Sequence, residues 1–231
     1  MKLTLYERVI HNFVTDNRWR YLTTGLKNTL LVALFAVLIG VAIGFIIAMI
    51  RTTHDKTGRL KLLNFIAKIY LTIIRGTPTT IQVLICYFVI FASVDVDKVL
   101  AASVAFGINS GAYVAEIFRS GIMSVDRGQL EAGRSLGLNY GKTMWLIVMP
   151  QAIKNVLPAL GNEFIVLLKE TSISGYIALQ DLTKGADIIR SRTYDAMMPL
   201  FAAAAIYLVM VMILERLVGR LERRLAKSDY R

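Results

Sequence analysis

The sequence contains little of the side-chain chemistry on which enzymes and metal sites are built. Its 231 residues include two histidines, His11 and His54, which stand apart in polar stretches, and one cysteine, Cys86, in an apolar run. A single cysteine cannot form an internal disulfide, and no second metal ligand stands at a suitable spacing from it. No serine–histidine–aspartate pattern or metal-binding motif is recognisable, so an enzymatic reaction would have few residues to use.

A complete phosphate-binding loop is also missing, although one segment comes close. Gly137-Leu-Asn-Tyr-Gly141-Lys142-Thr143 places three residues between its glycines, whereas the loop requires four before Gly-Lys-Ser/Thr. The preceding residues are polar and do not read as the buried strand that such a loop follows. We therefore expect a turn between two helices here, and no nucleotide site.

Acidic residues are much fewer than basic residues, and this charge imbalance limits the classes of protein to which the chain can belong. The chain has 16 Asp and Glu against 27 Lys and Arg, which gives a formal net charge of +11. Hydrophobic residues make up 55% of the chain and the mean hydropathy is +0.55, both high for a soluble domain. The charges cluster between long apolar runs rather than along a basic, aromatic-rich stripe. This distribution predicts a membrane protein with no nucleic-acid partner.

Five apolar runs predict an all-α integral membrane protein, with residues 1–231 forming one transmembrane domain. The first run, residues 29–50, carries no charge, and as a helix it would be about 33 Å long, enough to cross the hydrocarbon core. It is too long, and its polar leader too extended, for a cleaved signal peptide. The other expected spans are residues 76–94, 99–115 with a continuation towards Met123, 157–179 and 196–214.

The Lys and Arg distribution predicts how these spans are oriented. Basic residues are concentrated in the segments after the first span, after the third span and in the tail 215–231. The positive-inside rule therefore places the C-terminus in the cytoplasm and the N-terminus outside. Residues 1–22 disagree, because they are also basic, and we interpret them as an amphipathic segment at the membrane surface.

The cytoplasmic segment between the third and fourth spans, residues 126–154, is predicted to be ordered. We expect a short helix from Asp126 to about Leu136, a glycine turn and a second helix from about Tyr140. Arg127, Glu131 and Arg134 would lie on the exposed face of the first helix, where a cleft in another protein could receive them. The alternative is a loop that only connects two spans.

Here the sequence resembles the ABC importer permeases. Glu131-Ala132-Gly133, Gly137, Ile147 and Pro150 resemble the EAA loop of that family, with Gly133 in place of an alanine and Met149 in place of a leucine. Three further stretches resemble its polar amino acid uptake branch (histidine, glutamine or arginine type). They are residues 75–78, 109–116 and 157–172.

The resemblance implies a membrane-spanning subunit of an ATP-driven importer in the bacterial cytoplasmic membrane. It implies a second permease subunit, which we expect to be a copy of this chain, two ATPase subunits and an extracytoplasmic solute-binding protein. ATP and Mg²⁺ would be used by the ATPase, so this chain would need no cofactor and would not be an enzyme. Contact with the ATPase would fall on the coupling residues Glu131, Ala132, Gly133, Arg134 and Gly137.

Polar residues at membrane depth are the candidates for substrate binding, because ionisable groups there are costly and tend to be paired or functional. Pro78 disfavours helix at Thr77, so a broken helix is expected there. Glu163 could accept the cationic end of an amino acid with a cationic or amide side chain. The full candidate set is Arg75, Thr77, Asn109, Ser110, Asn162 and Glu163.

Structural alternatives apply to these residues and to the chain as a whole. Arg75 could pair with an acidic residue such as Glu116 and only stabilise the fold. A self-contained channel or secondary transporter would also explain buried charges, but five spans provide no internal two-fold repeat. A membrane-embedded enzyme is disfavoured by the missing catalytic clusters.

Overall fold

The computed structural model describes residues 4–226, and within them the chain is helical and contains no strand. Short helical segments occupy the N-terminal part: α1 (Leu5–Val9), η1 (Ile10–Val14) and η2 (Thr15–Asn17). The longer helices and the short segments that continue them are α2 (Trp19–Thr57), α3 (Lys61–Gly76), α4 (Thr79–Ile85), η3 (Cys86–Ile90), α5 (Lys98–Met123), α8 (Met149–Glu170), η5 (Thr171–Ile177) and α10 (Met197–Ala226). The connecting helices are α6 (Arg127–Ser135), α7 (Tyr140–Thr143), η4 (Met144–Val148) and α9 (Leu182–Thr193).

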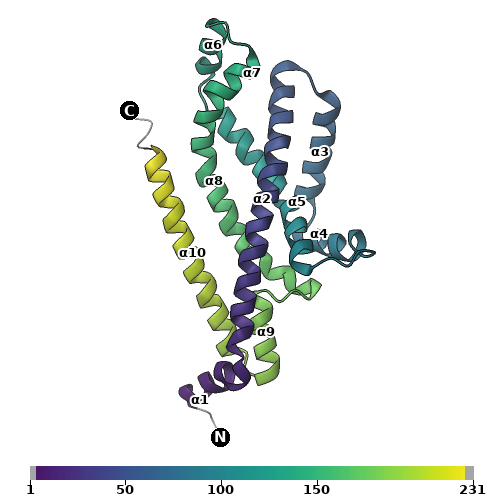
Figure 1. Cartoon of the computed structure of the whole chain (residues 1–231), viewed down its shortest axis with the longest axis vertical. Coiled ribbons are helices and arrows are strands. Elements are labelled where there is room, and N and C mark those ends of the chain that lie inside the picture. Colours follow the sequence, from purple (N-terminus) through teal and green to yellow (C-terminus); the bar gives the residue numbers. More distant parts are fainter. Residues whose placement is uncertain (1–3, 227–231) are drawn as a thin grey trace.

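The molecule is elongated, and different helices stand at its two ends (Figure 1). Helix α2 runs along the middle, with α10 on one side and α3 on the other. Helices α6 and α7 stand at one end, towards which the C-terminal helix also points, whereas α1 and α9 lie at the opposite end. The predicted coupling segment and the described part of the basic tail, residues 215–226, therefore lie towards the same end of the molecule.

The most extensive contact between helices in the described part of the chain is that of α2 with α5, and small residues allow the two helices to approach closely. A Cβ added at Gly44 of α2 would lie 2.6 Å from Cγ1 of Val114 and 2.7 Å from the backbone nitrogen of Ala115. One turn earlier, a Cβ at Gly40 would lie 2.9 Å from the hydroxyl of Ser110. Helices in membranes associate through such small-residue contacts, because lipid removes the hydrophobic driving force. Larger residues at either glycine would displace α5.

Helix α9 packs against the first turns of α2 through polar contacts. The hydroxyl of Thr29, a fully buried residue, accepts a hydrogen bond of 3.1 Å from the backbone N–H of Leu182. Asn28 donates to the carbonyl of Gln180 at 2.9 Å. The carboxylate of Asp181 accepts from the backbone of Thr183 and Lys184 and so caps α9. These bonds hold the segment after α8 on the surface of α2.

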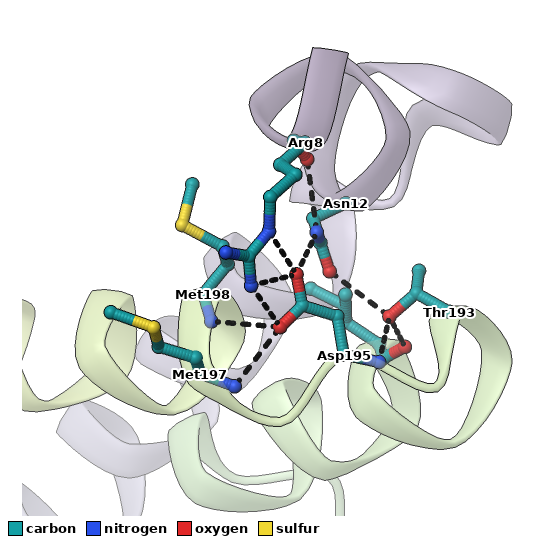
Figure 2. Close-up of polar contacts among 7 residues, drawn as sticks. Arg8, Asn12, Thr193, Asp195, Met197 and Met198 are labelled. Atoms are coloured by element: carbon teal, nitrogen blue, oxygen red, sulfur yellow. Dashed lines mark hydrogen bonds and ion pairs between the residues drawn. The ribbon is translucent and has the colours of Figure 1, made fainter. Parts of the chain in front are cut away.

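The N-terminal segment is attached to the corner between α9 and α10 (Figure 2). Arg8 of α1 forms a forked ion pair with Asp195, with its terminal nitrogen 2.8 Å from each carboxylate oxygen. Asn12 donates to the same carboxylate at 3.0 Å and accepts from the hydroxyl of Thr193 at 3.0 Å. Leu5 and Tyr6 remain exposed, at 72% and 74%. Location of the 1–22 segment at the membrane surface stays a prediction, and its residues 1–3 lie outside the described part.

The helices agree with only some of the expected spans. Within the described residues, α2, α5 and α10 are long and apolar enough to cross a membrane by themselves, which fits the first, third and fifth runs. The second run differs, because α3 ends at Gly76 and the chain bends by 110° into α4 and η3. Pro78 causes this break, as expected. The fourth run differs too, since α8 begins at Met149 and gives way to a 3₁₀-helix at Thr171.

Candidate substrate site and coupling segment

Glu163 and Ser110 lie in direct contact near the middle of the helical bundle. Ser110 is fully buried, halfway along α5, because α2 approaches it closely at Gly40. Its hydroxyl donates a hydrogen bond of 2.7 Å to the carboxylate of Glu163, which belongs to α8. Glu163 is partly exposed and retains a second carboxylate oxygen for another partner. The pair can therefore present a positioned acceptor to a cation.

Asn109 and Thr77 are joined through a residue that the sequence analysis did not select, Gln82 of α4. Asn109 is buried and donates to the side-chain carbonyl of Gln82 at 2.8 Å. The amide nitrogen of Gln82 donates to the backbone oxygens of Ile74 and Thr77 at 2.7 and 3.0 Å. The last carbonyls of a helix need such partners because the helix itself supplies none. Gln82 thus closes the end of α3 and fixes the broken helix to α5.

A signal for Gln82 was present in the sequence. It is the uncharged amide in the otherwise apolar stretch 81–91, five residues after Thr77. Polar groups at membrane depth require partners, and a broken helix offers free carbonyls near the break. The two observations together could have predicted the contact with the break. The pairing with Asn109 depends on how α4 packs on α5, which sequence spacing does not provide.

Arg75 lies at the end of α3 and contacts two residues of α5. Its guanidinium is 3.7 Å from the carboxylate of Glu116 and 5.5 Å from the ring centroid of Tyr113. The expected pairing with Glu116 is therefore present, at a distance typical of a loose ion pair. The side chain of Arg75 remains 41% exposed. It can contact a ligand without giving up a buried hydrogen bond.

Glu116 and Arg75 belong to a longer row of alternating charges. Arg119 is 3.4 Å from Glu116 and 3.6 Å from Asp55, near the end of α2. Asp55 and Arg119 also line a cavity of about 400 Å³ that extends to Arg127 and Glu131 of α6. The row connects the end of α3 with the cavity beside α6.

The structure does not bring all six candidate residues into one place. Ser110 and Glu163 form one group, and Thr77 and Asn109 form a second group around Gln82. The donors of Thr77 and Asn109 are already used within the protein, since the hydroxyl of Thr77 donates to Ile73. Asn162, next to Glu163, has an exposed side chain.

The coupling segment has the local structure that the sequence predicts. Asp126 caps α6 by accepting from the backbone N–H of Gly128 at 2.7 Å. Gly137 adopts a left-handed conformation, with φ +82°, and donates to the carbonyl of Arg134 at 2.9 Å. Leu138 donates to the carbonyl of Gly133 at 3.1 Å, which completes a Schellman ending. The short helix, the glycine turn and the second helix from Tyr140 are confirmed.

The predicted coupling residues differ in their exposure. Glu131, Ala132, Arg134 and the turn residue Gly137 are exposed, whereas Gly133 is buried. A Cβ at Gly133 would lie 2.5 Å from Cγ2 of Thr143 and 2.9 Å from Cδ1 of Ile147. A glycine at this position therefore lets α6 pack tightly on the helix that follows. The departure from the Glu-Ala-Ala pattern has a packing reason.

Comparison with known proteins places the chain in a family. Residues 40–227 match the profile of the family described as binding-protein-dependent transport system inner membrane component. The arginine transport system permease ArtQ of Bacillus subtilis (strain 168) is 37% identical over 211 residues, covering 90% of this chain and 94% of that protein. The glutamine transport system permease GlnP of Escherichia coli (strain K12) is 34% identical over 207 residues, covering 88% of this chain and 92% of that protein.

Solved structures agree with this placement. The crystal structure of an amino acid ABC transporter with histidines matches with a TM-score of 0.82 and 41% identity, over 97% of this chain and 100% of that one. An inward-facing MetNI methionine ABC transporter shares the fold, with a TM-score of 0.75 at 17% identity, over 90% of this chain and 97% of that one. The chain belongs to the family of inner membrane components of binding-protein-dependent transport systems.

Proposed function

We propose that this chain is the membrane-spanning permease subunit of an ATP-driven importer of polar amino acids with a cationic or amide side chain. The observation that carries the proposal is the Ser110–Glu163 contact, which holds a carboxylate in the helical bundle. An acidic group in such a place is costly unless a cation accompanies it. The relatives ArtQ and GlnP are named for arginine and glutamine transport, which supports this class of substrate.

The two ends of a zwitterionic amino acid need opposite partners. We assign the cationic group of the substrate to Glu163 and its carboxylate to Arg75, whose guanidinium is exposed and only loosely paired. Ser110 positions Glu163, whereas Thr77, Asn109 and Gln82 hold the broken helix that carries Arg75. Helix breaks are common at transporter sites because they free backbone groups near the substrate.

Coupling to ATP hydrolysis is assigned to α6. Its exposed residues Arg127, Glu131 and Arg134 form a charged face that a cleft in a separate ATPase subunit could receive. The Schellman ending at Gly137 fixes the direction of the helix, which suits an element that transmits force. The other expected partners are a second copy of this chain and an extracytoplasmic solute-binding protein, and the family description names such binding proteins.

The proposed topology has five spans, with the N-terminus outside and the C-terminus in the cytoplasm of a bacterium. The spans are α2, the broken pair α3–α4, α5, α8 and α10. Helix α8 is not among the helices that are long and apolar enough to qualify by themselves, and it carries Glu163 within its length. The positive-inside rule supports this orientation, because α6 and the C-terminal end of α10, with its basic residues, lie towards the same end (Figure 1).

Reconstitution tests the function directly. The chain would be assembled in proteoliposomes with its ATPase subunit and solute-binding protein, and uptake of labelled arginine, glutamine and leucine would be measured. We expect uptake of arginine or glutamine that needs ATP and the binding protein. Uptake without ATP would favour a secondary transporter and contradict the proposal.

A further inference from the structure

An open groove of about 390 Å³ lies between α2 and α3 and belongs to neither site described above, although Arg75 borders it. Its lining consists of Arg51, Lys68, Leu71, Thr72 and Arg75. Three of these five described residues are cations, one offers a hydroxyl donor, and none is acidic. The groove is therefore suited to an anion with several oxygen atoms.

The cations of the groove are poorly compensated by the protein. The Nε atom of Arg51 is buried and has no hydrogen-bond partner within residues 4–226. Arg75 is 3.7 Å from Glu116, its one ion pair in that part of the chain. A buried donor without an acceptor costs free energy, and like charges side by side add to that cost. A ligand with a negative charge would relieve both.

The position of the groove along the helices matches the border of the hydrocarbon core. Arg51 is the first charged residue after the uncharged run 29–50 of α2. Lys68 lies about 10 Å from the start of α3, and Arg75 lies two turns further. Side chains on a helix lean towards its N-terminus, so both cations of α3 reach back towards the membrane surface. Arg51 and Lys68 therefore lie at a similar depth, suited to lipid phosphates, and Arg75 lies two turns deeper.

An apolar surface continues directly from the groove. Phe65 and Ile69 of α3 are 61% and 44% exposed, and they share a helix face with Thr72 at spacings of four and three residues. A soluble anion would leave this apolar surface uncovered, whereas the acyl chains of a lipid would cover it. Charge and apolar surface stand side by side, as in the headgroup pockets that form between transmembrane helices.

We propose that this groove binds the phosphate of an anionic phospholipid. Arg51, Lys68 and the hydroxyl of Thr72 contact the phosphate oxygens, and the chains lie along Phe65 and Ile69. A zwitterionic lipid is disfavoured because its ammonium group would face three cations. The site does not depend on the proposed transport function. The orientation given above assigns it to the cytoplasmic leaflet.

The test compares lipid retention by the full-length protein and its variants. The assembly would be purified in mild detergent with a mixture of phosphatidylglycerol and phosphatidylcholine, and bound lipid would be counted by native mass spectrometry. We expect the wild-type protein to retain phosphatidylglycerol selectively. Lys68→Gln and Arg51→Gln should each weaken its binding about fivefold, since each cation near the surface contributes about 1 kcal/mol. Lys68→Glu should weaken phosphatidylglycerol binding further. Because Lys68 is exposed, this substitution should leave the fold intact.

The control is Arg59→Gln, which removes the same charge from the exposed loop between α2 and α3. This change should leave retention unaltered. An equal loss of phosphatidylglycerol in Arg59→Gln would show that the basic surface attracts the lipid in general, and this result would overturn the proposed site. Retention unchanged by Lys68→Gln, Lys68→Glu and Arg51→Gln would overturn it as well. Displacement of the lipid by millimolar inorganic phosphate would identify a soluble anion as the ligand and contradict a lipid site.

Discussion

The side chain of Asn109 donates a hydrogen bond of 2.8 Å to Gln82, across 27 positions of sequence and between two helices. Gln82 in turn binds the carbonyls at the end of α3. The side-chain amide of Gln82 therefore provides hydrogen-bond partners both for the carbonyls at the end of α3 and for Asn109 in the middle of α5. Asn109 is buried, so its side-chain amide has few replacement partners if Gln82 is removed.

Gln82→Met should destabilise the protein more than a typical surface change. The variant keeps the size of the side chain but leaves Asn109 and the carbonyl of Ile74 without partners, each at a cost of roughly 1–3 kcal/mol. The thermal unfolding midpoint of the purified protein should fall by several degrees. Gln151→Met, at an exposed amide of α8, is the matched control and should change the midpoint little. Equal midpoints for Gln82→Met and the wild type would contradict the structural role of Gln82.

Glu163→Gln tests the proposed acceptor for the substrate's cationic group. The change keeps the shape of the side chain and its contact with Ser110 but removes the charge. Uptake of a cationic amino acid should fall at least about tenfold, since a charge-assisted hydrogen bond contributes roughly 1.5–3 kcal/mol. Uptake of a neutral amino acid should fall less. If all uptake is unchanged and only the yield of assembled complex falls, Glu163 is a structural partner.

Glu131→Lys and Gly137→Val test the coupling segment by different means. Glu131 is exposed, so reversing its charge should abolish ATP-driven uptake without affecting membrane insertion. Gly137 has φ +82°, and a β-branched residue there costs roughly 1–2 kcal/mol or more, which should misdirect α6. Substrate-stimulated ATP hydrolysis and uptake would be measured together. Normal uptake by stably inserted Glu131→Lys protein would argue against coupling through this face.

Acid should release the N-terminal segment from the α9–α10 corner. Partial burial raises the pKa of Asp195, but hydrogen bonds from Arg8 and Asn12 outweigh it and hold that pKa below its ordinary value. The stabilisation is thus fully present above the ordinary aspartate pKa of about 3.9 and is lost as pH falls through the lowered value. Fluorescence of Trp19 in a Trp145→Phe background would follow the release. Asp195→Asn lacks the titrating group and should show no such transition.

Cysteine labelling tests the topology, and the native Cys86 does not interfere because it is buried. Asp95→Cys, in the exposed loop before α5, should react with an impermeant thiol reagent added outside. Lys142→Cys, at an exposed position of α7, should react only after permeabilisation. The reverse pattern would mean that the basic residues of the 1–22 segment determine the orientation.

The sequence by itself determined the helical membrane class, the break at Thr77-Pro78 and the helix–turn–helix from Asp126 to Tyr140. These features depend on hydropathy, on the missing donor of proline and on the left-handed conformation that glycine permits at position 137. All three act over a few neighbouring residues, so a linear pattern contains them. The α2, α5 and α10 spans are evident for the same reason, because an uncharged run of membrane length has few alternatives.

Only the tertiary structure decided which polar groups meet. Ser110 and Glu163 are 53 positions apart, and Arg8 and Asp195 are 187 apart. The first contact depends on how α8 packs on α5, and the second depends on how α1 meets the corner between α9 and α10. The sequence placed Asn109 and Ser110 together in the set of candidate substrate residues, but adjacent helical residues point about 100° apart. The fold therefore turned Ser110 towards Glu163 and Asn109 towards Gln82, and so separated the two groups.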